Sequence, residues 1–425
     1  MTLRATLLSY RQRGRQISRN CWLFLWMVFL SNVGLSGIFA LLYNLYLVAL
    51  GHHEDFIGVL SFVQMAAIAL GAIPASRLSE RFGPRRVLLA GSLVVGMSTL
   101  GLCLATRPWM LALWNLSMGL GFALRIVPYT PYLVRNTTRA ERTLIFSANS
   151  AAISLAGTIG SLLGGQLPTL AARLLGLGAA DSIPAYRASL LVGAAIGLLA
   201  VLPMAFASES TPASEAAANG SESSAPAEDP PTPRRAVTIL VGVTVLFSLA
   251  GACFMPFTNV YLSEVLGLQA SAISLIFSSS SILAVIATIL ASDVADRYGK
   301  ARTLSIVRAS AAPLLVALAL APSVWLGTIT VVVRGITDMA AWPLDNAFLA
   351  DVIPLRRQAR VTSYRSIAWN LTWALASFAA GQAIVRFGYQ GVILLSAVVL
   401  FSGGLIYYSA FGRGQRKTVQ AGAGL

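Results

Sequence analysis

Two similar stretches of sequence decide the fold: Ser76–Arg86, SRLSERFGPRR, and Ser292–Arg302, SDVADRYGKAR. Both follow one order of residue types: a small residue, an aliphatic residue, a carboxylate, an arginine, an aromatic residue, a glycine and then basic residues. Each copy lies between two long apolar runs, at a corresponding place in its own half of the chain. The glycine in each copy permits the backbone of a tight turn. The sequence therefore indicates an internal duplication, in which each copy joins two helices.

The composition places these helices in a membrane. Hydrophobic residues make up 56% of the 425 residues and charged residues only 11%, whereas charged residues are about a quarter of an ordinary soluble domain. The apolar residues form blocks long enough to cross a bilayer, which takes about 20 residues per helix. We predict an all-α integral membrane protein whose twelve transmembrane helices form two pseudo-symmetric six-helix bundles. The predicted spans are 22–49, 56–75, 87–106, 109–134, 143–170, 187–207, 237–263, 270–291, 303–321, 324–349, 362–385 and 389–411.

A break in composition separates the two halves. Residues 208–236 are rich in Ser, Ala, Pro and Glu and show no apolar period, so this segment cannot bury enough surface to order itself. We predict an N-terminal bundle over 1–207, a flexible cytoplasmic linker over 208–236 and a C-terminal bundle over 237–425.

The net charge of +15 follows from the uneven distribution of basic residues. Most of them fall in segments on one predicted side, including those at 297–308 and 356–365, whereas only Arg125 and Arg334 are assigned to the interior of spans. This asymmetry is typical of the positive-inside rule. It predicts a multi-pass protein of the cell membrane with both termini in the cytoplasm, and it requires no nucleic acid. The three cysteines and the adjacent pair His52 and His53 predict no disulfide, metal site or cofactor.

The duplicated stretch resembles the loop signature of the major facilitator superfamily, Gly-x-Leu-Ala-Asp-Arg-x-Gly-Arg-Arg, which follows the second helix and has an echo after the eighth. The first copy departs from it at Ser76, Glu80 and Pro84. The resemblance implies that charge pairs from these loops hold the cytoplasmic side shut in one state. The implied gating residues are Glu80, Arg81, Gly83, Arg85, Asp296, Arg297, Gly299 and Arg302.

The resemblance also implies a central substrate cavity lined by helices 1, 4, 7 and 10, and these helices carry polar residues that are costly in a membrane. Asn44 and Asn259 occupy matching places in FALLYNLYL and FMPFTNVYL. Helical spacing puts the other candidates on one face of helix 4 and one face of helix 10. These candidates are Arg125, Tyr129 and Tyr132, and Arg334, Asp338, Trp342 and Asp345.

Two interpretations of the helix 10 charges stay open. Arg334 and Asp338 can neutralise each other as a structural pair. Alternatively, Asp338 or Asp345 takes up and releases a proton, because desolvation raises the pKa of a carboxyl group.

The fifth span carries a small-residue pattern, with Gly160, Gly164 and Gly165. It is similar to the family's Gly-x-x-x-Gly-Pro-x-x-Gly-Gly signature of drug and other antiporters. Ala156 stands where the first glycine is expected, and Ser161 stands where the proline is expected. Ordinary small-residue helix packing also explains it. The arginine that the family carries in helix 4 would fall at Asn115 and is absent.

We therefore expect a secondary active transporter, not an enzyme, that moves a small organic solute by alternating access. Proton-coupled efflux is the leading hypothesis, and we expect a monomer whose partners are the solute, protons and the bilayer. Proton-coupled uptake of a sugar or metabolite is the alternative within this class. A transport-inactive membrane sensor with the same fold is the alternative from another class.

Overall fold

The computed structural model describes residues 18–177, 179–208 and 234–412. Within these ranges the chain is helical and contains no strand. Most of the predicted linker, residues 209–233, lies outside the described residues, as do the basic residues before position 18 and after position 412.

Each half of the chain forms six long helical segments. Those of the N-terminal half are α2 (Arg19–Asn32), η1 (Val33–Phe39) and α3 (Ala40–Ala49) in one continuous segment, then α4 (Glu54–Phe82), α5 (Pro84–Leu104), α6 (Pro108–Arg135), α7 (Arg139–Leu175), and α8 (Ile183–Leu199) with α9 (Val201–Ala205). Those of the C-terminal half are α11 (Arg234–Phe254), η2 (Met255–Phe257), α12 (Thr258–Val260) and η3 (Tyr261–Val265), then α13 (Ala270–Tyr298), α14 (Lys300–Ala309) with α15 (Ala312–Leu320), α16 (Val324–Val352), α17 (Leu355–Phe387), and α18 (Tyr389–Tyr407) with η4 (Tyr408–Gly412).

The twelve-helix membrane fold is confirmed. Eleven helical segments of the described chain are long and apolar enough to cross a bilayer. The twelfth is α17, which is 33 residues long but carries several arginines and polar residues near its start. Because α17 packs along α4 and α11, it completes the second bundle in spite of this polarity.

The duplicated stretches prove to be helix ends rather than loops. Helices α4 and α13 continue past their predicted ends to Phe82 and Tyr298, and in each case one glycine separates them from the next helix. The backbone angles are nearly equal, φ 84° and ψ 150° at Gly83 against φ 91° and ψ 138° at Gly299. This region is open only to glycine. The duplication is therefore visible in the backbone as well as in the sequence.

The first helical segment of each half is interrupted by irregular turns. In the N-terminal half, the π-helix η1 interrupts the segment before Asn44. In the C-terminal half, the 3-10 turn η2 and the π-helix η3 flank Asn259. Such interruptions leave backbone groups without their regular helical partners and are frequent at functional sites.

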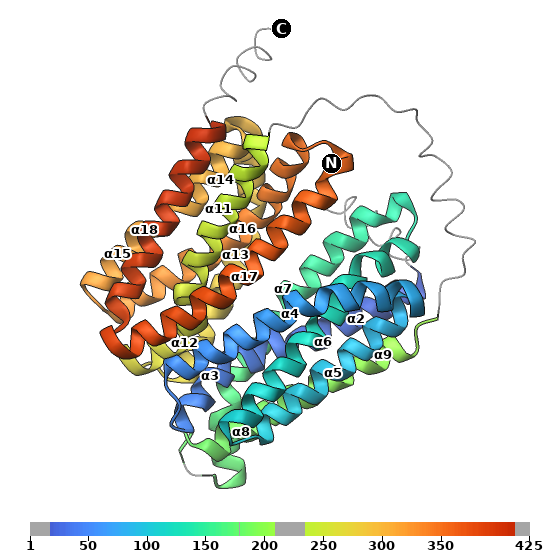
Figure 1. Cartoon of the computed structure of the whole chain (residues 1–425). Coiled ribbons are helices and arrows are strands. Elements are labelled where there is room, and N and C mark those ends of the chain that lie inside the picture. Colours follow the sequence, from blue (N-terminus) through green and yellow to red (C-terminus); the bar gives the residue numbers. More distant parts are fainter. Residues whose placement is uncertain (1–17, 178, 209–233, 413–425) are drawn as a thin grey trace, which may run out of the picture.

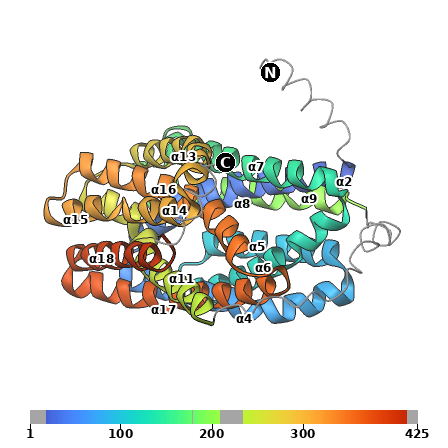
Figure 2. The same ribbon diagram turned by 90° about the horizontal axis from the view of Figure 1, so that it is seen from above.

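The two bundles meet at one end and diverge toward the other (Figure 1). We call the end that holds the turn at 50–53 the distal end, and the end where α2 begins and η4 finishes the termini end. Figure 1 shows the bundles meeting near α3 and α12, at the distal end, and separating toward α9 and the start of α11. Seen from above, α7 lies beside α13 on one edge and α4 beside α17 on the other (Figure 2).

Small residues bring these helix pairs close together at the distal end. A methyl group on Gly58 of α4 would lie 2.6 Å from the carbonyl oxygen of Ser377 in α17. Gly165 of α7 lies against the side chain of Ser274 in α13. Tyr389 of α18 also donates a 2.7 Å hydrogen bond across the halves to Glu54 of α4. The distal end is therefore closed by close helix contacts, by hydrogen bonds and by a buried apolar cluster with residues from both halves.

We expect Gly83→Ala and Gly299→Ala to lower stability by about 1–3 kcal/mol each, because alanine is strained at these angles. An added methyl group at Gly83 meets no atom within 4 Å, so the cost there comes from the backbone alone. Gly391→Ala in α18 is the control, since that glycine has ordinary helical angles and open space around it. Thermal unfolding of the purified protein measures the effect. Equal thermal unfolding midpoints for all three variants would contradict the claim that Gly83 and Gly299 occupy a backbone region that strains alanine.

Candidate functional site

A cavity of about 770 Å³ lies between the two halves. Its wall comes from both ends of the sequence, because η1, α3, α4, α6 and α7 of the first half face η2, α12, α13, α16 and α17 of the second. Its polar lining residues are Ser36, Tyr43, Asn44, Ser61, Gln64, Asn115, Ser154, Ser161, Asn259 and Ser281. Among the described residues that line it, no side chain carries a formal charge.

Asn44 and Asn259 join the halves at this cavity. The Asn44 side-chain amide donates to the carbonyl oxygen of Pro256 at 2.7 Å, and the Asn259 amide donates to that of Leu41 at 2.9 Å. The two side chains also approach each other, at 3.5 Å between Asn44 Nδ2 and Asn259 Oδ1. Each asparagine therefore binds backbone of the opposite half, next to an irregular turn.

Asn115 orients a tyrosine in the cavity wall. Its Nδ2 donates to Tyr43 Oη and to the carbonyl oxygen of Leu111, both at 2.9 Å. Asn115 is almost fully buried at 3% exposure. The position at which the resemblance expects an arginine therefore holds a neutral amide, and it takes part in a fixed polar pair.

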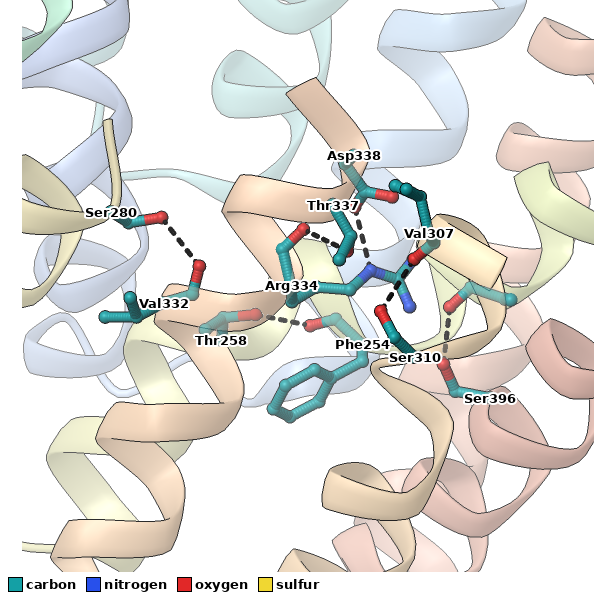
Figure 3. Close-up of polar contacts among 11 residues, drawn as sticks. Phe254, Thr258, Ser280, Val307, Ser310, Val332, Arg334, Thr337, Asp338 and Ser396 are labelled. Atoms are coloured by element: carbon teal, nitrogen blue, oxygen red, sulfur yellow. Dashed lines mark hydrogen bonds and ion pairs between the residues drawn. The ribbon is translucent and has the colours of Figure 1, made fainter. Parts of the chain in front are cut away.

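The predicted pair on α16 forms. Arg334 Nε donates to Asp338 Oδ2 at 2.8 Å, and their side chains are 8% and 28% exposed. Figure 3 shows the guanidinium of Arg334 directed at Asp338, with Thr337 bonded to the Arg334 backbone. Neither charged residue lines the cavity, but their neighbour Met339 does. The pair therefore lies outside the lining, on the helix that contributes Met339 to it.

A larger charge cluster surrounds Asp345 and includes two residues that the sequence analysis misplaced. Arg308 and Arg365 were assigned to the basic cytoplasmic segments, but they lie in α14 and α17 with side chains only 9% and 15% exposed. Arg365 donates to Asp345 through Nη2 and to Thr244 through Nε, the latter at 2.8 Å. Arg308 lies 4.0 Å from the same carboxylate and 4.2 Å from the centre of the Phe247 ring.

This cluster ties together four helices of the C-terminal half. Thr244 and Phe247 belong to α11, Arg308 to α14, Asp345 to α16 and Arg365 to α17. One carboxylate therefore balances two arginines inside the bundle. Periodicity placed Asp345 on the same face of helix 10 as Asp338, but its partners come from other helices.

Comparisons with known proteins agree with this architecture. The sequence profile described as Major Facilitator Superfamily matches residues 24–242 and again 240–423. The chain belongs to the major facilitator superfamily. It is thus a multi-pass membrane protein and a secondary transporter of small solutes. No curated relative matches the sequence.

Solved structures of family members share the fold. A bacterial homolog of the human lysosomal transporter Spinster, in an inward-facing and occupied conformation, has TM-score 0.71 and 15% identity, over 91% of this chain and 96% of its own. The nucleoside transporter NupG, solved as a mutant, has TM-score 0.70 and 15% identity, over 92% and 100%. A D-xylose-proton symporter has TM-score 0.69 and 14% identity, over 94% and 97%.

The charged residues of the family's loop signature lie at the termini end. Glu80, Arg81, Asp296 and Arg297 are exposed on the last turns of α4 and α13. Glu80 accepts a hydrogen bond from Ser76 at 3.4 Å, and Arg85 donates to the carbonyl oxygen of Ala205 at 2.8 Å. Arg302 is partly buried in α14. These contacts stay within one half, in a conformation in which the two halves are apart at this end.

The glycines of the helix 5 pattern lie at close helix contacts. Gly160 and Gly164 pack on Val33 and Ile38 of the first helical segment, whereas Gly165 packs on α13 of the other half. Ser161, which stands at the family's proline, lines the cavity. The pattern therefore allows close approach both within the N-terminal bundle and between the halves.

The remaining candidates do not converge on the cavity. Tyr132 is buried against Phe24 in the core of the N-terminal bundle, and Tyr129 packs on the same ring. Arg125 lies 5.9 Å from the centre of the Phe122 ring, and Phe122 does line the cavity. Trp342 is 66% exposed on α16. None of Arg125, Tyr129, Tyr132 and Trp342 is part of the cavity wall.

Sequence reasoning missed two features of the site. The sequence analysis did not place Gln64 of helix 2 among the leading cavity candidates, although it lines the cavity. The partners of Asp345 were missed because charge counting assigned basic residues near span ends to the loops. A basic residue inside a predicted span, as Arg308 is in 303–321, was the available signal. Within the described chain, no group of three His, Cys, Asp or Glu residues could hold a metal ion.

We expect Asp345→Asn to destabilise the protein by about 3–5 kcal/mol, because it leaves two buried arginines without their counter-charge. Asp351→Asn is the matched control: this carboxylate pairs with Lys300 on the surface at 48% exposure, so its loss costs no more than about 1 kcal/mol. Thermal unfolding in detergent measures both. Adding Arg308→Gln to Asp345→Asn should recover part of the lost stability. Equal effects of Asp345→Asn and Asp351→Asn would contradict a central role for Asp345.

Proposed function

We propose that this chain exports a small organic solute across the cytoplasmic membrane by proton-coupled alternating access. The observation that carries the proposal is the cavity, which lies between two bundles that meet at only one end. A solute held there can be exposed to either side if the bundles rock, so that the distal end opens as the termini end closes. The basic residues at the termini end favour a cytoplasmic location for that end. In this orientation the described conformation faces the cytoplasm, and the transporter acts as a monomer.

The distal contacts suit a closure that has to open again. They include individual hydrogen bonds from Asn44, Asn259 and Tyr389, glycine contacts between helices, and a buried apolar cluster that both halves share. Each such bond contributes a net free energy of only about 0.5–1.5 kcal/mol. The opposite state would then be held by the signature residues, with Glu80 and Asp296 near helix ends of the facing half and the arginines in charge pairs.

Asp338 is the residue that we assign to proton coupling. Its side chain is the more exposed partner of the Arg334 pair, and it adjoins a cavity residue, Met339. Protonation of Asp338 would remove the negative charge that holds Arg334, and α16 would then be free to shift. Asp345 is less suited to this role, because it balances two arginines at once.

Export rests on the resemblance of the helix 5 pattern to the antiporter signature. A second candidate function is uptake by proton symport. The uncharged cavity wall favours it, because such a wall suits a neutral metabolite. The fold is also that of a D-xylose-proton symporter, although this likeness shows the fold alone.

The proposal is tested in proteoliposomes that contain the pH dye pyranine and carry an imposed pH gradient. With a panel of sugars, nucleosides and neutral aromatic amides, we expect at least one solute to move protons. Asp338→Asn should reduce this movement to that of protein-free liposomes, because asparagine cannot exchange a proton. Asp181→Asn, in an exposed turn, is the matched control and should keep full activity. Unchanged coupling in Asp338→Asn removes Asp338 from the mechanism, and the direction of solute flow relative to protons separates export from uptake.

A further inference from the structure

The polar groups of the cavity wall differ in whether they are already occupied. Asn259 has both of its polar atoms engaged, since Nδ2 donates to Leu41 and Oδ1 accepts from the backbone N–H of Val260. Ser281 donates within its own helix to Phe277 at 2.9 Å. These groups maintain the protein structure and have little left to offer a ligand.

A second set of polar groups is free to bind a solute. Among the described residues, the side chains of Gln64 and Ser61 on α4 have no hydrogen-bond partner in the protein, although both line the cavity. Tyr43 accepts a bond from Asn115, which leaves the phenolic proton of Tyr43 available as a donor. All of these residues belong to the N-terminal half. Together they present donors and acceptors on one wall.

The opposite wall is mainly apolar. The C-terminal half contributes Met255, Phe277, Met339 and Trp373 to the lining. Aromatic rings and flexible methionine side chains form adaptable contacts with flat apolar molecules. The C-terminal half therefore offers mainly apolar contacts, whereas the free hydrogen-bonding groups of the N-terminal half lie among apolar residues such as Phe39, Met118 and Phe122.

The uncharged lining of the cavity disfavours charged solutes. None of the described residues that line the cavity carries a formal charge, and the ion pairs of Arg334 with Asp338 and of Arg365 with Asp345 lie outside the lining. A charged solute that enters the cavity would lose hydration without gaining an ion-pair partner, and this cost is large. An uncharged solute pays only for its hydrogen-bonding groups, which the first wall can satisfy.

Close packing of α4 against α6 fixes the backbone position of Gln64. Gly119 of α6 packs directly on the Gln64 carbonyl group and on Ala67, so any larger residue at 119 would separate α4 from α6. The free amide of Gln64 is thus presented from a fixed backbone position rather than from a mobile loop.

We propose that the cavity binds an uncharged, largely apolar aromatic solute, whose hydrogen-bonding end contacts Gln64, Ser61 and Tyr43 and whose ring lies against Trp373 and Phe277. This inference rests on the proposed function and names its substrate class. Gln64 is the residue that determines the choice of a neutral polar group.

The test compares solutes that differ in charge but little in shape. Indole-3-acetamide, indole-3-acetate and tryptamine form one set of neutral, anionic and cationic molecules, and N-acetylphenylalaninamide, N-acetylphenylalanine and phenylalaninamide form another. Isothermal titration of the purified full chain gives the affinities. We expect the neutral member of at least one set to bind at least about tenfold more tightly than its charged partners, a difference of about 1.4 kcal/mol. Equal or tighter binding of a charged member, or no binding by either neutral member, overturns the proposal.

Two variants of Gln64 test its role. Gln64→Leu should weaken neutral-amide binding roughly 3–10-fold, which is the effect of one hydrogen bond. Ser409→Ala is the control and should leave binding unchanged, because this exposed serine donates only to Ile406 and does not line the cavity. Gln64→Glu should reverse the charge preference and make tryptamine the tighter ligand. An unaltered preference in Gln64→Glu contradicts the assignment even if Gln64→Leu folds poorly.

These measurements separate the inference from the proposed function, because binding in detergent requires no gradient. Neutral solutes that bind but move no protons would defeat proton-coupled transport and leave the substrate class standing. If only charged solutes were transported, in a flux that depends on Asp338, proton-coupled transport would stand and the proposed substrate class would be wrong.

Discussion

Hydrocarbon offers no hydrogen bonds, and this constraint shapes every level of the structure. It requires spanning segments to be helices whose backbone groups bond internally. Where the backbone departs from regular helix, around η1, η2 and η3, side-chain amides supply bonds between the halves, through Asn44 and Asn259. The same constraint explains why the buried arginines of the C-terminal bundle gather around two carboxylates. The charged side chains of the C-terminal bundle are therefore paired with one another, and the cavity between the halves is lined by uncharged polar and apolar residues.

The result is a separation of charge from the cavity. Arg308, Arg334 and Arg365 with Asp338 and Asp345 lie among the helices of the C-terminal half, while the wall between the halves is uncharged. Helix α16 connects the two regions, because Asp338 and Met339 are neighbours on it. In the proposed mechanism, a change of protonation at Asp338 therefore reaches the solute through movement of α16 and not through direct contact.

The sequence was sufficient for the fold because the decisive signals are local and repeated. Apolar runs marked the spans, and the paired stretches ending in Gly83 and Gly299 revealed the duplication. The matching positions of Asn44 and Asn259 also indicated residues of the cavity, and both line it. Side-chain partners on other helices were not accessible in this way. Periodicity placed Arg125, Tyr129 and Tyr132 on one face, but Tyr132 packs into the N-terminal core. Charge counting assigned Arg308 and Arg365 to the basic cytoplasmic segments, although both help to balance Asp345.

The central claim is that two rigid bundles rock about the cavity, and the helix pair α4 and α17 offers the most direct test because it spans both ends of the interface. Spin labels at the exposed positions 53 and 387 report on the distal end, and labels at 78 and 360 on the termini end. Double electron–electron resonance in lipid nanodiscs, with and without bound solute and across pH, measures both distances. The account predicts that one distance lengthens as the other shortens. Distances that stay fixed, or that change in the same direction at both ends, would contradict it.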